Sequence, residues 1–81
     1  MNKAKKAFKS SISFRDPMMA GKCKELLQTR FPSVEFYVDD RRGGFGGDEI
    51  FRGISTFGSV SLANRIKMNW FIEGFFEALE I

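Results

Sequence analysis

The C-terminal stretch from Asn69 to Ile81 constrains the fold most, because no other segment is as dense in large apolar side chains. At the period of an α-helix one broad face is apolar, and it carries Met68, Phe71, Ile72, Phe75, Phe76 and Leu79. The opposite face carries Asn69, Glu73, Glu77 and Glu80. We therefore predict a helix whose apolar face anchors the core, with each large buried side chain contributing about 1.5–3 kcal/mol. Gly74 lies within this helix, and close approach of another backbone would explain a glycine there.

Trp70 lies off that apolar face, on a side that it shares with Leu62, Ala63 and Ile66. Three explanations remain open: a helix that is kinked or buried on two sides, a helix that starts only near Asn64, or an exposed apolar patch for a partner. In the second case Ser59–Ala63 is not helical and could be a short fourth strand. We expect Trp70 in the core, because a domain of 81 residues needs nearly all of its apolar side chains for stability.

Three segments read as strands. Phe8–Phe14, Val34–Asp39 and Ile50–Phe57 each alternate in the way of a half-buried strand, although the face of the third is ambiguous. Between the first two, Asp16-Pro17 is a typical helix start, and apolar residues recur at helical spacing as far as Phe31, before Pro32. We predict a single α+β domain over residues 8–81 with a β-α-β-β-α order. Its three-stranded sheet contains an antiparallel hairpin of the second and third strands, and two helices cover one face.

This order of elements is similar to that of the DinI-like modulators of recombination filaments and of several other small α+β modules. The likeness is one of layout, without a diagnostic motif, so the function is argued from the residues themselves.

The charge is uneven along the chain. Residues 1–33 carry a net charge of +6 and residues 34–81 a net charge of −3, which gives +3 overall. Residues 1–7 read as a flexible basic arm. The cations placed for contact with a polyanion are Lys3, Lys5, Lys6, Lys9, Lys22 and Lys24. The alternative is a solvated basic surface that keeps a small protein soluble.

The glycine-rich link between the second and third strands is the candidate site. It contains Arg41, Arg42, Gly43, Gly44, Phe45, Gly46 and Gly47. Two guanidinium groups beside free backbone N–H groups can hold phosphate, and Phe45 could stack on an unpaired base. Asp39, Asp40, Asp48 and Glu49 flank this tip and oppose a polyanion. A tip that contacts a protein, and a plain linker whose arginines pair with its aspartates, are the alternatives.

Catalytic and metal motifs do not stand out in this sequence. Without histidine there is no zinc site of the usual kind and no histidine base. The acidic residues that flank the tip could hold Mg²⁺ or Ca²⁺, but their spacing matches no calcium loop, so we expect no metal, no cofactor and no enzyme. Cys23 is a single cysteine at an apolar helical position, which favours a buried thiol and a cytoplasmic setting. No apolar run is long enough to span a membrane.

Two functions follow as hypotheses. The first is a small non-enzymatic protein that docks on a protein partner, for example a nucleic-acid-processing one, through the hairpin and an edge strand, in the manner of phage or mobile-element inhibitors and adaptors. The second is direct binding of nucleic acid by the basic N-terminal half and the arginine- and glycine-rich tip. The oligomeric state, monomer or homodimer, is left open by the sequence.

Overall fold

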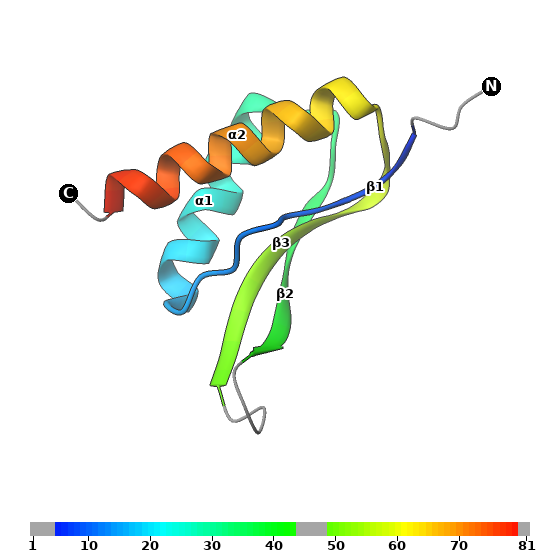
Figure 1. Ribbon diagram of the computed structural model, residues 1–81. Coiled ribbons are helices and arrows are strands. Elements are labelled where there is room, and N and C mark those ends of the chain that lie inside the picture. Colours follow the sequence, from blue (N-terminus) through cyan, green and yellow to red (C-terminus); the bar gives the residue numbers. More distant parts are fainter. Residues whose placement is uncertain (1–4, 44–48, 80–81) are drawn as a thin grey trace.

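The computed structural model describes residues 5–43 and 49–79, and it confirms the predicted order of elements (Figure 1). The elements are β1 (Lys6–Lys9), α1 (Pro17–Arg30), β2 (Phe36–Gly43), β3 (Glu49–Val60) and α2 (Leu62–Leu79). The three strands form one antiparallel sheet in the order β1-β3-β2. Both helices lie on the same face of this sheet, and the other face is open.

Local chemistry explains where α1 begins and ends. The Asp16 carboxylate accepts a hydrogen bond from the Met18 N–H at 2.9 Å, and Pro17 occupies the first helical position, as predicted. The helix ends at Arg30, where the Phe31 N–H still donates to the Leu27 carbonyl at 2.8 Å before Pro32.

The first strand differs from its prediction. It spans Lys6–Lys9 and so includes two residues of the predicted basic arm, whose residues 1–4 lie outside the described part. The Ser10 hydroxyl accepts from the Ile54 N–H at 3.0 Å and donates to the Ile12 carbonyl at 2.8 Å. The Ser10 side chain thus takes the Ile54 N–H that a backbone carbonyl of a continued strand would otherwise accept, so the strand stops early and Phe14 rejoins β3 only as an isolated bridge to Arg52.

The structure decides where β3 ends and α2 begins, which the sequence left open. β3 continues to Val60, and α2 starts at Leu62, two residues before the start near Asn64 that one of the explanations gave. The Ser61 hydroxyl accepts from the Asn64 N–H at 3.3 Å, which caps the first turn. The described part of the chain therefore has no separate strand at 59–63.

The core lies between the sheet and the two helices. Its fully buried apolar side chains come from all five elements and the β1–α1 link, and they are Phe8, Phe14, Ala20, Cys23, Leu27, Phe36, Ile54, Val60, Met68 and Ile72. The ring of Phe14 meets the rings of Phe75 and Phe76 edge to face, with centroids 5.9 and 5.6 Å apart. The C-terminal helix is thus an anchor of the core, as its sequence predicts.

Three expectations about α2 are not met. Trp70 is 68% exposed rather than buried, because α2 packs through Met68 and Ile72, and a residue two positions after Met68 falls on the opposite side of a helix. Leu79, which shares the predicted apolar face, is exposed at the end of the helix. At Gly74, an added Cβ would meet nothing within 4 Å among the described residues, so no backbone of this chain approaches it closely.

Candidate partner-binding site

The structure separates the residues of the predicted hairpin tip. Arg41, Arg42 and Gly43 belong to the end of β2, and residues 44–47, with Phe45, lie outside the described residues. Since successive side chains of a strand point to opposite faces, Arg41 and Arg42 do not converge on one ligand. Arg41 lies on the open face of the sheet, and Arg42 on the other.

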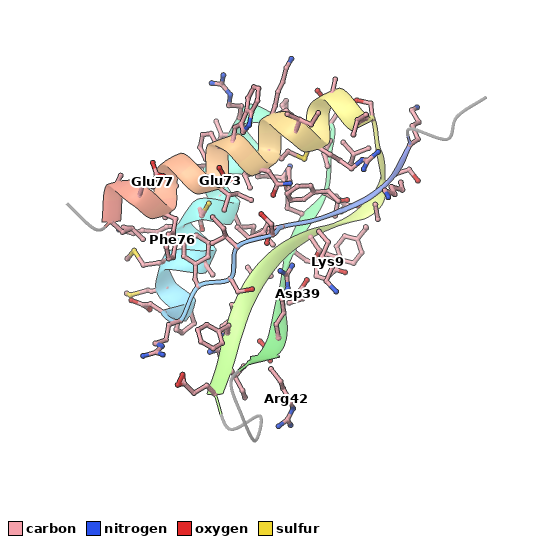
Figure 2. The ribbon with its side chains drawn as sticks, viewed as in Figure 1. Lys9, Asp39, Arg42, Glu73, Phe76 and Glu77 are labelled. Atoms are coloured by element: carbon pink, nitrogen blue, oxygen red, sulfur yellow. The ribbon has the colours of Figure 1, made fainter. Side chains whose placement is uncertain are left out.

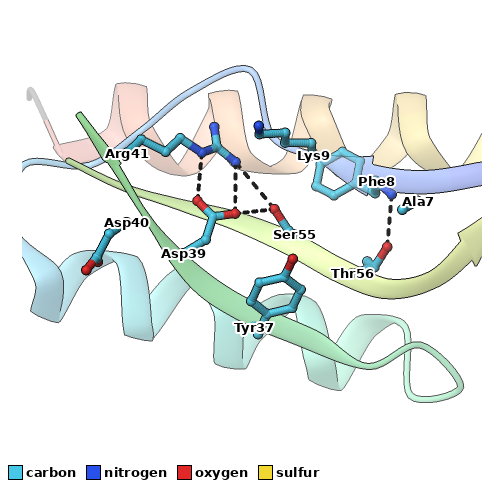
Figure 3. Close-up of a pocket in the computed structure, with 9 residues that line it drawn as sticks. All are labelled: Ala7, Phe8, Lys9, Tyr37, Asp39, Asp40, Arg41, Ser55 and Thr56. Carbon is cyan, nitrogen blue, oxygen red and sulfur yellow. Dashed lines mark hydrogen bonds and ion pairs between the residues drawn. The ribbon is translucent and has the colours of Figure 1, made fainter. Parts of the chain in front are cut away.

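Arg41 is held in place by its own fold (Figure 3). Its Nε donates to the Asp39 carboxylate at 2.8 Å, and its Nη1 donates to the Ser10 carbonyl at 2.5 Å. The Ser55 hydroxyl donates to the second oxygen of the same carboxylate. We call Ser10, Asp39, Arg41 and Ser55 the sheet-face network.

Gly53 makes this network geometrically feasible. It lies opposite Asp39 in β3, and the guanidinium of Arg41 passes directly over it on the way to Ser10. A Cβ at position 53 would overlap the Arg41 guanidinium. The glycine therefore lets a β2 side chain cross β3 and tie β2 to the segment that follows β1.

The sheet-face network borders a hollow of about 440 Å³, whose other lining residues include Lys9, Tyr37 and Thr56 (Figure 3). Burial alone would raise the pKa of the Asp39 carboxyl. The hydrogen bonds from Arg41 and Ser55, together with the positive charges of Arg41 and Lys9, outweigh burial and hold that pKa below its usual value. The charged groups here satisfy one another, so this face is built mainly for stability.

The predicted polyanion contacts do not form one patch. Lys3 lies outside the described residues, and Lys5 and Lys6 lie at the start of the described chain, both exposed. Lys9 lines the hollow on the open sheet face (Figure 2). Lys22 and Lys24 lie on α1, on the helical side of the sheet, and two residues apart in a helix they point to nearly opposite sides.

The acidic residues that flank the tip are likewise paired with arginines. Asp39 binds Arg41, Asp40 lies 3.5 Å from Arg52, and Glu49 lies 2.8 Å from Arg15, while Asp48 lies outside the described residues. In the described part of the chain no three carboxylates, cysteines or histidines gather where they could hold a metal ion.

Cys23 lies in the core with no exposed surface. Burial raises the pKa of its thiol to about 12, so the thiol stays protonated at neutral pH. A protonated and inaccessible sulfur is a packing group rather than a nucleophile.

The helical layer presents a different surface. Leu62, Ile66 and Trp70 recur every fourth residue along α2, and their exposed fractions are 49, 40 and 68%. Side chains at this spacing lie on one side of a helix, so they form a continuous apolar patch. An exposed apolar patch of this kind is the third of the sequence-based explanations for the position of Trp70.

A groove lies beside this patch, between the C-terminal end of α1 and the middle of α2. It has a volume of about 610 Å³ and is lined by Leu26, Thr29, Arg30, Phe31, Lys67 and Phe71. A second hollow that shares Arg30, Lys67 and Phe71 extends it to Trp70. We call the two together the α1–α2 groove. Its floor is aromatic and aliphatic, and its rim is cationic.

The two rim cations have no acidic partner within the part of the chain that the structure describes. In the described residues neither Arg30 nor Lys67 forms an ion pair, and no carboxylate lines the groove. Arg30 lies in the last turn of α1, where the negative end of the helix dipole favours a cation. The dipole therefore explains in part why an arginine occurs there. No such argument applies to Lys67 in the interior of α2.

The sequence-based candidate site lies at the hairpin tip and does not include this groove. The signal was the shared side of Leu62, Ile66 and Trp70, which the sequence shows but assigns to the core. The contribution of Leu26 and Arg30 depends on how the two helices pack, and no periodicity encodes that.

No family model, curated protein or solved structure matches this chain. In the described part of the chain no helix combines the length and apolar content needed to cross a membrane.

Proposed function

We propose that this chain is a small non-enzymatic binding protein that docks on a protein partner through the apolar patch and the α1–α2 groove. The observation that carries the proposal is the exposed Trp70, aligned with Ile66 and Leu62 beside a hollow with an apolar floor. A small domain that leaves its single tryptophan in water forgoes a large gain in stability. Tryptophan is also the side chain most enriched among the residues that dominate protein–protein binding.

Docking through the helices replaces the hairpin tip and edge strand as the proposed contact. Arg41 is committed to the sheet-face network, and Arg42 points to the other face. The role as an adaptor or inhibitor of another protein is unchanged by this shift of surface.

The test is capture of a partner from an extract of the source cells on the immobilised full chain. Trp70→Ala should lose the retained protein, because truncating such an anchor costs about 2 kcal/mol or more, or roughly 30-fold in affinity. Met18→Ala is the matched control, since Met18 is also 68% exposed but lies on α1. A retained protein that Trp70→Ala holds as well as the wild-type chain would refute the proposal.

A second candidate function rests on a separate observation. Phe57 is 68% exposed and its ring lies 4.4 Å from that of Tyr37, next to Lys9 on the open sheet face. Unpaired bases stack on exposed aromatic rings of sheets, with lysines holding the phosphates. Direct binding of single-stranded DNA or RNA should then weaken with a slope of about −0.7 per phosphate contact as salt rises. No binding of a labelled oligonucleotide at low salt would exclude it.

A further inference from the structure

The α1–α2 groove has a chemical character that specifies its occupant more closely than an apolar surface alone does. Its floor is formed by Leu26, Phe31 and Phe71, and Trp70 closes one end. Arg30 and Lys67 stand on its rim without acidic partners among the described residues. A ligand that fills this groove must offer apolar side chains to the floor and negative charge to the rim.

Among the described residues no acidic group lines this groove, and Glu25 lines a neighbouring hollow that shares Leu26 and Thr29 with it. Glu73 and Glu77 lie on the other half of α2 and point away from the sheet (Figure 2). Neither lines the groove. The cationic half and the acidic half of α2 are thus separated along the helix, and the rim of the groove keeps its positive charge.

We infer that the α1–α2 groove binds an acidic amphipathic helix of a partner protein, which places its apolar side chains on Phe71 and Trp70 and its carboxylates against Arg30 and Lys67. This inference rests on the proposed function and names the chemistry of the partner. Grooves of this kind take a helix through anchors at i, i+3, i+4 and i+7. Carboxylates suit the rim because a guanidinium and a carboxylate form paired hydrogen bonds.

The shape of the site favours a helix over a lipid surface. A membrane presents a broad interface to an amphipathic helix and needs a convex apolar ridge with no walls. Here the apolar residues Leu26, Phe31 and Phe71 line a hollow of about 610 Å³ between two helices. A hollow suits a single inserted segment better than the flat surface of a bilayer does.

The probe is a synthetic amphipathic helix of about 18 residues, which is close to the length of α2, with leucine on one face and glutamate on the other. Its twin carries lysine at every glutamate position. Because the chain contains a single tryptophan, the emission of Trp70 reports contact at the groove directly. We expect the acidic peptide to shift this emission and to bind about tenfold more tightly than the basic twin, because each of the two rim cations pairs with a carboxylate of the acidic peptide.

The decisive variant is Arg30→Glu combined with Lys67→Glu. Both side chains are exposed, so the variant should keep the circular dichroism of the wild-type chain. Its unfolding transition should shift only slightly, because a carboxylate at position 30 meets the negative end of the α1 dipole. Its preference should reverse, so that the basic twin binds more tightly. An unreversed preference, or no shift of the Trp70 emission with either peptide, overturns the inference.

Two other occupants, a lipid membrane and a second copy of this chain, would give different results in the same experiments. A shift with vesicles of anionic lipid but not with the acidic peptide would assign the groove to a membrane and overturn the inference. A mass that doubles with concentration in light scattering, and returns to that of a monomer in the charge-reversed variant, would assign it to a second copy and also overturn it.

The capture experiment separates failure of this inference from failure of the proposed function. If Trp70→Ala loses the partner while the charge-reversed variant retains it, docking at the groove stands and its acidic specificity does not. If neither variant loses the partner, both ideas are refuted.

Discussion

The two faces of this molecule handle their charged and apolar groups in opposite ways. On the open face of the sheet, Asp39 and Arg41 are about four-fifths buried and bonded to each other, to Ser10 and to Ser55. On the outer surface of the helices, Arg30 and Lys67 border an apolar groove without acidic partners in the described chain. We propose that stability depends mainly on the sheet-face network and docking mainly on the helical surface, so that a substitution should disturb one of them without the other.

The largest expected effect on stability is a difference between substitutions of Arg41 and of Arg30. Arg41→Ala should lower the free energy of unfolding by about 2–3 kcal/mol, because it removes hydrogen bonds to a charged group and leaves the Asp39 carboxylate without its cation. Arg30→Ala should change it by less than about 0.5 kcal/mol, since the exposed Arg30 has no ion pair among the described residues. Urea denaturation of both variants measures the difference, and equal losses would contradict the contrast.

A substitution of Gly53, beneath the sheet-face network, should lower the free energy of unfolding by a smaller amount. In Gly53→Ala the new methyl group would occupy the path of the Arg41 guanidinium, which must move off Asp39 and Ser10. We expect the free energy of unfolding to fall by about 1–2 kcal/mol, because the displaced guanidinium regains part of its hydrogen bonding from water. In the Arg41→Ala background the same change should cost almost nothing, and a double-mutant cycle with additive losses would contradict this account.

The sheet-face network should also make the stability of the fold depend on pH. The pKa of Asp39 is lower in the folded chain than its usual value, so its contribution to stability is complete above the pKa of the unfolded state. That contribution is lost as pH falls through the folded pKa. Asp39→Asn should therefore flatten the acid limb of stability measured by urea denaturation between about pH 5 and pH 2, and an unchanged acid limb would contradict the prediction.

The smallest expected effect on folding lies on the helical surface. Trp70→Ala should change the free energy of unfolding by about 0.5 kcal/mol or less, since the ring is 68% exposed and outside the core. A loss of about 3 kcal/mol or more, as expected for a buried tryptophan, would show that the ring is packed within the fold. Thermal denaturation followed by circular dichroism distinguishes these outcomes.

Local sequence signals predicted most of the fold. Asp16 and Pro17 mark the start of α1 because capping depends on adjacent residues, and the alternation around Phe36 and Ile54 specifies a hairpin. The early end of β1 escaped prediction because Ser10 bonds to Ile54, a residue distant in sequence.

The candidate site was less predictable because its contacts also join residues that are distant in sequence. Arg41 lies beside a glycine-rich link in the sequence, but its partners include the carbonyl of Ser10, which is remote along the chain. Trp70 belongs to a helix with apolar residues on two sides, and periodicity does not say which side meets the sheet. Only the packing of Met68 and Ile72 decides it.

The exposure of Trp70 in the free chain is the most direct test of the division between the two faces. Acrylamide quenching of the single tryptophan in the monomer should be close to that of free tryptophan, and its emission should lie at the wavelength of a ring in water. A blue-shifted emission with strong protection from quenching would mean that the ring is already covered, and the helical surface would then not be free to bind a partner.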